Sequence, residues 1–359
     1  MEAGALSSGR LPAVAHSLVP PAATPGALAG ALQPEALVAD LEHAGLALLA
    51  CPSELAAPIS HALQLGPELL RSCGLPRAAQ RLHAAAEAQG LALAYKQQGR
   101  LKERLQVRRL ARSSQTMAEP PPGGARSSMA LPETGPEEGE AREAEEAGEA
   151  RAAVVALEAA LVAFEKLALA AFGAWCRVWG VPGEEALRRF GDPGHGPGEP
   201  LGGKHKSVLN LYHYFNDGGC EEEPCREHAD PGLVTILCRS TNAGLQVRLP
   251  RCPGGAPGHA AEYEEAWLDV EPAMDDCAHE GGPVLLAAVG ETLERLSGCR
   301  VPSCRHRVAK TVGPRFNAAY ELRPRTNVWH AWPALAGPGL GVSPGAAVLE
   351  APEGRGAGA

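Results

Sequence analysis

The sequence predicts an α+β protein in which helices lead into a sandwich or jelly roll of short β-strands. Apolar residues recur at helical spacing over 33–98 and again over 152–179. From Lys206 onward the pattern changes to short apolar or alternating runs separated by Gly, Pro and Asn turns. Short strands joined by such turns are typical of sandwiches and jelly rolls.

The N-terminal part predicts a disordered lead-in and then a mainly helical region over 33–112. Residues 1–32 are rich in Ala, Pro and Gly and show no clear period. A helix begins near Pro34, which the first turn of a helix tolerates. The pattern then predicts a strand over 45–50 and helices over 53–72 and 75–98.

A segment of different composition separates the two halves. Residues 113–151 are dominated by Pro, Gly, Ser and Glu and contain no aromatic residue. Such a segment buries too little apolar surface to offset its ordering entropy, so we expect a disordered acidic linker. Residues 152–203 follow as helices packed on the core, with a long helix from Ala152 to Trp179 and a short one over 184–190.

The C-terminal half predicts a β-domain over 204–330 and a disordered tail over 331–359. The tail is rich in Gly, Pro and Ala. Because strand residues alternate between two faces, Ser207–Tyr214 reads as a strand with Val208, Tyr212 and Tyr214 on one side. Further strands are expected over 233–238, 244–249, 265–270, 283–289, 307–312 and 315–322.

Composition narrows the functional classes. The chain has 359 residues with 33 Lys and Arg against 42 Asp and Glu, a formal charge of −9. This balance argues against a nucleic-acid-binding surface, which is usually basic. The most apolar stretch, residues 152–173, is interrupted by charges and predicts a buried helix rather than a membrane span.

The N-terminus and the cysteines bear on location. The first residues lack the basic start and continuous apolar run of a secretory signal. We therefore expect a cytoplasmic protein, with an organellar transit peptide as the alternative. Ten cysteines in a chain this long do not resemble a small disulfide scaffold, so reduced thiols are expected.

The strongest chemical signal is a candidate metal clamp. His228 and Asp230 are two residues apart, and on a strand such residues project from one face. His306 is the best candidate for a third ligand, because sequence-distant strands are neighbours in a jelly roll. Two His and one carboxylate that leave positions open suggest non-haem Fe(II) and oxygen chemistry. A lone His-x-Asp pattern is also common in surface turns.

An arginine downstream adds to the signal. Arg315 follows His306 by nine residues, on a strand that we expect to run beside the metal. The planar guanidinium of Arg can bind both oxygens of a carboxylate and so fix its orientation. Arg307 and Arg323 are competing candidates, whose alternative role is in surface ion pairs.

These residues occur within a longer resemblance. Residues from about 207 to 325 resemble the core of the plant-type 2-oxoglutarate/Fe(II)-dependent dioxygenases, the isopenicillin N synthase-like family. The stretches that carry the resemblance are LNLYHYF (209–215), EHADPGLVTIL (227–237), GLQV (244–247), VGETLERLSG (289–298), CRHRV (304–308) and PRFNAAYELRP (314–324).

The resemblance implies a double-stranded β-helix, the jelly-roll form, with N-terminal helices packed around it. It implies that His228, Asp230 and His306 hold Fe(II), that Arg315 and Asn317 bind the distal carboxylate of 2-oxoglutarate, and that Tyr214 contacts the same co-substrate. It also implies a small-molecule substrate, dioxygen, hydroxylation or desaturation with release of succinate and CO2, and ascorbate as an optional accessory. We expect a monomer that binds neither nucleic acid nor membrane.

The chain departs from the family pattern in ways that keep alternatives open. The family has Ser where this chain has Asn317, although the Asn amide can still donate a hydrogen bond. One alternative is an oxidase of this fold that does not use 2-oxoglutarate, and another is a non-catalytic jelly roll that binds a partner. Structural zinc is a third alternative, held by Cys220, Cys225 and His228 or by Cys299, Cys304 and His306.

Overall fold

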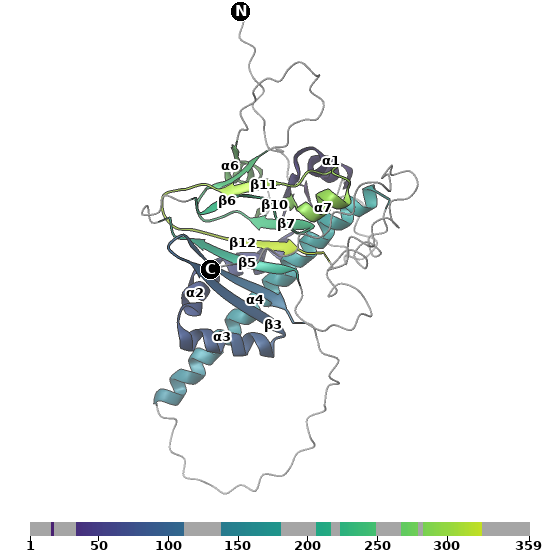
Figure 1. Cartoon of the computed structure of the whole chain (residues 1–359). Coiled ribbons are helices and arrows are strands. Elements are labelled where there is room, and N and C mark those ends of the chain that lie inside the picture. Colours follow the sequence, from purple (N-terminus) through teal and green to yellow (C-terminus); the bar gives the residue numbers. More distant parts are fainter. Residues whose placement is uncertain are drawn as a thin grey trace, which may run out of the picture.

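Two β-sheets face each other, and helices cover the outer face of the larger one (Figure 1). The computed structural model describes residues 16–17, 34–110, 138–180, 206–216, 223–248, 267–278 and 283–324. The larger sheet has the strand order β1-β2-β10-β7-β12-β5-β4-β3, and the smaller one β6-β11-β8-β9. This arrangement confirms the predicted α+β fold with a jelly-roll core.

The N-terminal elements largely follow the predicted pattern. They are β1 (His16–Ser17), α1 (Pro34–Ala44), β2 (Leu46–Ala50), α2 (Ser53–Cys73) and α3 (Pro76–Ala88). The short strand β1 lies inside the predicted lead-in and pairs in parallel with β2. The other residues of 1–32 lie outside the described residues.

The prediction of one helix over 75–98 is wrong. After α3 the chain forms a hairpin of β3 (Leu91–Gln98) and β4 (Lys102–Arg109), which extends the larger sheet beside β5. Gly90 and Gly99 adopt φ values of +75° and +53°, a region that favours glycine, and they stand before β3 and in the turn of the hairpin. The region 33–112 thus contains three strands besides its three helices.

The long helix α4 (Glu138–Val178) begins earlier than predicted. Its first residues are rich in Glu and Ala, both good helix formers. An ion pair of 2.7 Å between Arg81 of α3 and Glu146 ties this end to the fold, and Ala150 is buried in the core. The expected linker over 113–151 is thus helical from Glu138, while 113–137 and the helix predicted over 184–190 lie outside the described residues.

The remaining strands agree well with the predicted ones. They are β5 (Val208–Tyr214), β6 (Cys225–His228), β7 (Val234–Cys238), β8 (Leu245–Arg248), β9 (Trp267–Asp269), β10 (Val284–Val289), β11 (Arg305–Val308) and β12 (Arg315–Leu322). Two short helices, α6 (Glu271–Cys277) and α7 (Glu291–Leu296), were not predicted. The strand expected over 307–312 is instead β11, which ends at Val308 because its pairing with β8 ends there at Leu245. The predicted tail lies outside the described residues.

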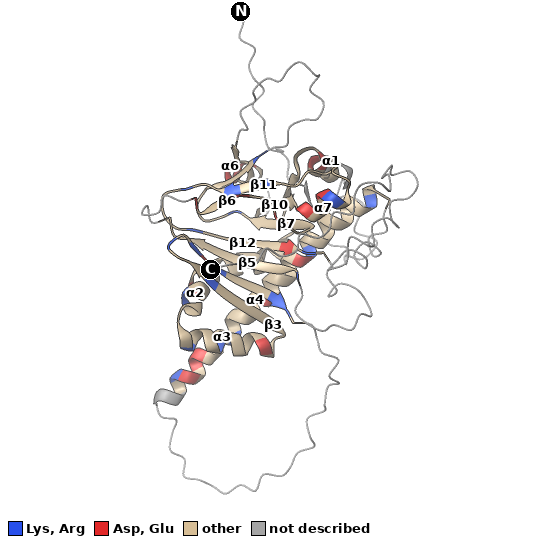
Figure 2. Ribbon diagram, in the orientation of Figure 1, with Lys and Arg blue, Asp and Glu red and all other residues tan. Residues whose placement is uncertain are grey.

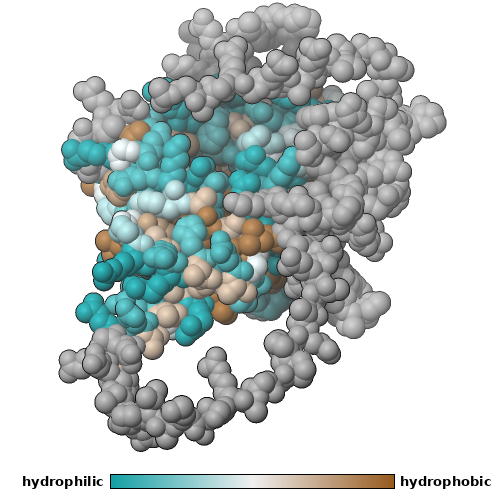
Figure 3. Space-filling view, turned by 60° about the horizontal axis from the view of Figure 1, so that its bottom comes forward, coloured by the Kyte–Doolittle hydropathy of each residue, from teal (hydrophilic) through white to brown (hydrophobic). Residues whose placement is uncertain are grey.

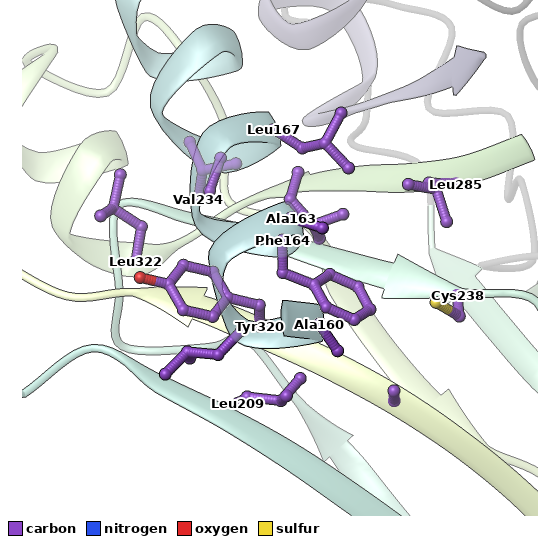
Figure 4. Packing of buried hydrophobic residues seen from close by; sticks show 14 of the residues in the cluster. Ala160, Ala163, Phe164, Leu167, Leu209, Val234, Cys238, Leu285, Tyr320 and Leu322 are labelled. Carbon is purple, nitrogen blue, oxygen red and sulfur yellow. The ribbon is translucent and has the colours of Figure 1, made fainter. Parts of the chain in front are cut away.

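The main hydrophobic core lies between the larger sheet and the helices. Helix α4 packs across this sheet, with α1 near one end and α2 and α3 near the other (Figure 1). Figure 4 shows Phe164 and neighbouring residues of α4 against strand residues such as Leu209 and Tyr320. A second apolar cluster, including Leu237, Leu245 and Leu286, lines the space between the two sheets. The larger sheet is therefore fixed from both sides and provides a rigid wall for the interior.

The surface and the thiols give further information on the described residues. On the face shown in Figure 3, hydrophilic and hydrophobic side chains are interspersed. No helix among the described residues is both long enough and apolar enough to cross a membrane. The cysteines of the described residues form no disulfide bond.

Candidate metal centre and co-substrate pocket

The smaller sheet brings two histidines together. His228 is the last residue of β6, and its antiparallel partner on β11 is His306. Their ring centroids are 4.3 Å apart. Asp230 follows two residues after His228, just beyond the strand, and its Oδ1 lies 3.6 Å from His228 Nε2. One ligand atom from each of the three residues lies within 4.8 Å of the other two, which is close enough to share one ion.

Hydrogen bonds orient the three side chains. The Nδ1 atoms of His228 and His306 lie 2.9 Å and 3.1 Å from the carbonyl oxygens of Arg226 and Cys304. A carbonyl oxygen can only accept, so each Nδ1 carries the proton and each Nε2 offers its lone pair to a metal. The hydroxyl of Thr235 donates to Asp230 Oδ2 at 2.7 Å, which leaves Oδ1 to face the histidines. Such outer contacts are what fix metal ligands in place.

The environments of the two histidines differ. Burial lowers the pKa of His306 from its ordinary value of 6.5, so this imidazole is neutral and ready to act as a ligand. Contact with the Cys225 thiol raises the pKa of His228 to about 9 in the metal-free protein. An ion that binds at neutral pH therefore displaces a proton from His228.

Arg315 lies at the start of β12 and is fully buried. Its Nη2 donates to Glu271 Oε1 of α6 at 3.2 Å. Its Nε and Nη1 make no hydrogen bond within the described part of the chain. Because unsatisfied buried donors are costly, either of these atoms favours an acceptor such as a carboxylate oxygen of a ligand.

The acid that holds Arg315 was not predicted. Glu271 is 2% exposed, and it accepts hydrogen bonds from the Ser240 hydroxyl at 2.7 Å and from the Leu245 backbone N–H at 3.2 Å. These contacts fix the carboxylate of Glu271, and through it the guanidinium of Arg315. Glu271 is thus a positioning residue for Arg315.

The register of β5 and β12 places the other two predicted residues beside Arg315. Arg315 pairs with Tyr214, and Asn317 pairs with Tyr212. The Arg315 guanidinium lies 5.3 Å from the centre of the Tyr214 ring. The side-chain oxygen of Asn317 is buried and finds no hydrogen-bond partner among the described residues. Arg315, Asn317 and Tyr214 therefore form one polar group on the inner face of the larger sheet.

A cavity of about 330 Å³ between the sheets joins the two groups. The three clamp residues line it together with Asn317 and Tyr214. Arg315 does not line the cavity itself. A ligand that pairs with Arg315 would therefore reach its guanidinium from the part of the cavity beside Asn317 and Tyr214. The cavity lies at the small end of the range for small-molecule sites, roughly 300–1,000 Å³. Its size suits small molecules rather than a macromolecular segment.

The chemistry of the clamp fits iron better than structural zinc. Among the described residues, the clamp is the only group of three suitable side chains within reach of one ion, and it contains no thiol. Two His and one carboxylate with open positions match non-haem Fe(II), whereas structural zinc sites are closed by four ligands. Cys225 Sγ lies 3.9 Å from His228 Nδ1, on the ring atom turned away from the clamp. Cys220 lies outside the described residues.

Comparisons with known proteins give one family match and several likenesses to solved structures. Residues 205–324 match the model of the 2OG-Fe(II) oxygenase superfamily. A full-length Neurospora crassa protein, solved in complex with alpha-KG and 5-formyluracil, is 16% identical with a TM-score of 0.50, and the match covers 81% of this chain and 78% of that chain. Dioxygenase for auxin oxidation 1 from Arabidopsis thaliana, solved with 2-oxoglutarate, is 14% identical with a TM-score of 0.46 over 81% of this chain and 88% of that one. No curated protein matches the chain.

Proposed function

We propose, from the premise that residues 205–324 form a domain of the 2OG-Fe(II) oxygenase superfamily, that this chain uses Fe(II) and 2-oxoglutarate to oxidise a small-molecule metabolite. The observation that carries the proposal is the shared cavity, which the clamp of His228, Asp230 and His306 lines together with Asn317 and Tyr214. One cavity can thus hold a metal, a co-substrate and a small substrate side by side.

The chain's residues divide the work as follows. Nε2 of His228, Nε2 of His306 and Oδ1 of Asp230 bind Fe(II). The free Nε or Nη1 of Arg315, with the amide of Asn317, would donate to the distal carboxylate of 2-oxoglutarate. A bound Fe(II) would supply oxygen activation: one atom of dioxygen would enter succinate as 2-oxoglutarate loses CO2, and the other would be available to oxidise a C–H bond of the substrate.

The protein contributes orientation and exclusion of water. Thr235 and the two backbone carbonyls hold the clamp, and Glu271 holds Arg315. These supports keep the co-substrate and the metal in one fixed relation, which is how positioning lowers a barrier. Apolar residues on the cavity wall, such as Leu237 and Leu245, limit water around the reacting C–H bond.

An anaerobic titration tests the proposal. Fe(II)-loaded protein is titrated with 2-oxoglutarate, and the visible absorption band of the bidentate complex is followed. We expect a saturable band in wild type and a co-substrate affinity at least about tenfold weaker in Arg315→Ala, because a buried charge-assisted pair is lost. Arg142→Ala, an exposed arginine of α4, is the matched control.

Two outcomes would overturn the proposal. Absence of the band in wild type would leave the chain without 2-oxoglutarate chemistry. A band that survives Arg315→Ala with unchanged affinity would favour an oxidase of this fold that does not use 2-oxoglutarate. Succinate release in air, measured across a panel of metabolites, then separates hydroxylation from desaturation by the mass of the product.

A further inference from the structure

The β3–β4 hairpin turns one face toward the cavity. Strand residues alternate between faces, and pairing sets Lys96 opposite Arg104 and Gln98 opposite Lys102. These four side chains line the cavity together with the clamp. The alternate residue Glu103 lies on the other face, where it accepts from the hydroxyl of Tyr95. The hairpin thus contributes three cations and one amide to the cavity. Figure 2 marks the lysines and arginines of the chain in blue, including those on this hairpin.

Aromatic rings hold two of these cations. The Lys102 ammonium lies 5.5 Å from the centre of the Tyr214 ring and 5.9 Å from that of Tyr212, and the two rings stack with centroids 5.9 Å apart. Arg104 hydrogen-bonds the Tyr212 side chain. Rings attract cations without neutralising them, so the charge of Arg104 remains available to a ligand. Lys102 also hydrogen-bonds the side chain of Cys225, another residue of the cavity wall.

Carboxylates do not balance this charge. No carboxylate of a described residue forms an ion pair with Lys96, Lys102 or Arg104. Two carboxyl groups line the cavity. Asp230 belongs to the clamp, and Glu321 already pairs with Arg323 at 2.5 Å. The hairpin side of the cavity is therefore positive while the chain as a whole carries a formal charge of −9.

We propose that Lys96, Lys102 and Arg104 bind the anionic group of the substrate, so that the metabolite oxidised at this centre is an organic acid. This inference rests on the proposed function, since it names the substrate class of the same site. Because the hairpin and the clamp line one cavity, an acid held by the hairpin can present its carbon skeleton to the metal. The anion also gives a small substrate a fixed orientation.

The co-substrate is the obvious competitor for these cations. Lys102 lies over Tyr214, which the proposed function gives to 2-oxoglutarate. Lys96 and Arg104 lie further along the hairpin, at the register of Tyr212. A variant of these two residues therefore separates the substrate role from the co-substrate role.

A pair of fluorinated probes tests the inference. Binding of 4-fluorophenylacetate and of its neutral amide is followed by ¹⁹F line broadening, on the full chain with Zn(II) and saturating 2-oxoglutarate and again without either. We expect wild type to bind the acid about tenfold more tightly than the amide, because charge-assisted bonds to two or three cations are lost in the amide. This preference should fall to about twofold in the Lys96→Gln/Arg104→Gln variant and shrink as NaCl is added.

The controls keep the result interpretable. Arg100→Gln removes an exposed charge from the same hairpin outside the cavity lining and should keep the preference. Thermal melting checks that the double variant folds, and the single variant Lys96→Gln, at an exposed position, provides a milder test. The inference is overturned if wild type shows no preference for the acid, including no binding of either probe, or if the preference survives in a folded double variant.

The affinity for 2-oxoglutarate distinguishes a wrong substrate class from a wrong proposed function. Calorimetry of 2-oxoglutarate should give the same affinity for wild type and for Lys96→Gln/Arg104→Gln. If wild type does not bind 2-oxoglutarate, the proposed function is refuted, whatever the result with the fluorinated probes. If wild type binds 2-oxoglutarate but does not prefer the acid probe to the amide probe, only the proposed substrate class is refuted.

Discussion

The buried ion pair between Glu271 and Arg315 gives the sharpest stability prediction. Arg315 is 0% exposed and Glu271 is 2% exposed. Glu271 Oε1 is the one carboxylate oxygen that pairs with this guanidinium among the described residues. In Glu271→Ala, Arg315 becomes a buried cation without a counter-charge, and the Leu245 N–H loses its acceptor. The Ser240 hydroxyl keeps only the carbonyl oxygen of Asn242 as an acceptor.

The size of the effect follows from these losses. Breaking a buried pair by removing one partner costs about 3–5 kcal/mol, because the remaining charge stays desolvated. We expect Glu271→Ala to lower the free energy of unfolding by that amount. Urea denaturation followed by circular dichroism measures it, provided that the transition is two-state.

An exposed pair on the same helix supplies the control. Asp275 of α6 pairs with Arg239, but their side chains are 50% and 44% exposed. Solvent screens such pairs, so Asp275→Ala should cost less than about 1 kcal/mol. If Glu271→Ala costs no more than Asp275→Ala, Arg315 is not held as a desolvated charge, and its assignment as a carboxylate receptor loses its physical basis.

Three further substitutions probe the cavity wall and its support. Burial raises the pKa of Glu321 to about 7, so its charging destabilises the fold progressively as pH rises from 4.5 through 7. Glu321→Gln should restore up to roughly 3 kcal/mol of the free energy of unfolding at pH 8. Denaturation at several pH values measures this, and a variant whose stability falls with pH as steeply as that of wild type would contradict the prediction. Gly66→Ala places a Cβ 1.9 Å from Phe316 Cζ and should destabilise by about 1–3 kcal/mol, whereas a neutral result would mean that the ring can move. Thr235→Val removes the hydroxyl that donates to Asp230 and should weaken Mn(II) binding about 10–100-fold in titrations followed by electron paramagnetic resonance, and unchanged affinity would refute its supporting role.

Much of the candidate site could be predicted from the sequence because its residues lie on short, regular strands. Alternation was enough to put Tyr212 and Tyr214 on one face of their strand, and the family resemblance supplied the roles of Arg315, Asn317 and Tyr214. The structure adds that Arg315 lies opposite Tyr214 on β5. The metal clamp needed the additional step that β6 and β11 are neighbours, which the jelly roll implies. His228 and His306 are in fact direct partners in register.

The parts that could not be predicted depend on long-range contacts. The sequence LALAYKQQ of β3 contains Ala, Leu, Lys and Gln, which are good helix formers, and it forms a strand because β4 and β5 offer a sheet edge. This error hid the cationic face of the hairpin. Glu271 lies in no motif, and its partner Arg315 follows 44 residues later.

Metal binding by the clamp is the most direct test of the whole account. Equilibrium dialysis with Fe(II) under anaerobic conditions, at a pH near neutrality, gives the number of bound ions and their affinity for wild type, Asp230→Ala and Cys225→Ala. Since loss of an outer contact alone costs about 10–100-fold, loss of the carboxylate ligand should weaken binding by at least that much. We predict one ion per chain in wild type and Cys225→Ala, and strongly weakened binding in Asp230→Ala. An ion that is retained in Asp230→Ala but lost in Cys225→Ala would show a thiolate site and contradict the oxygenase centre.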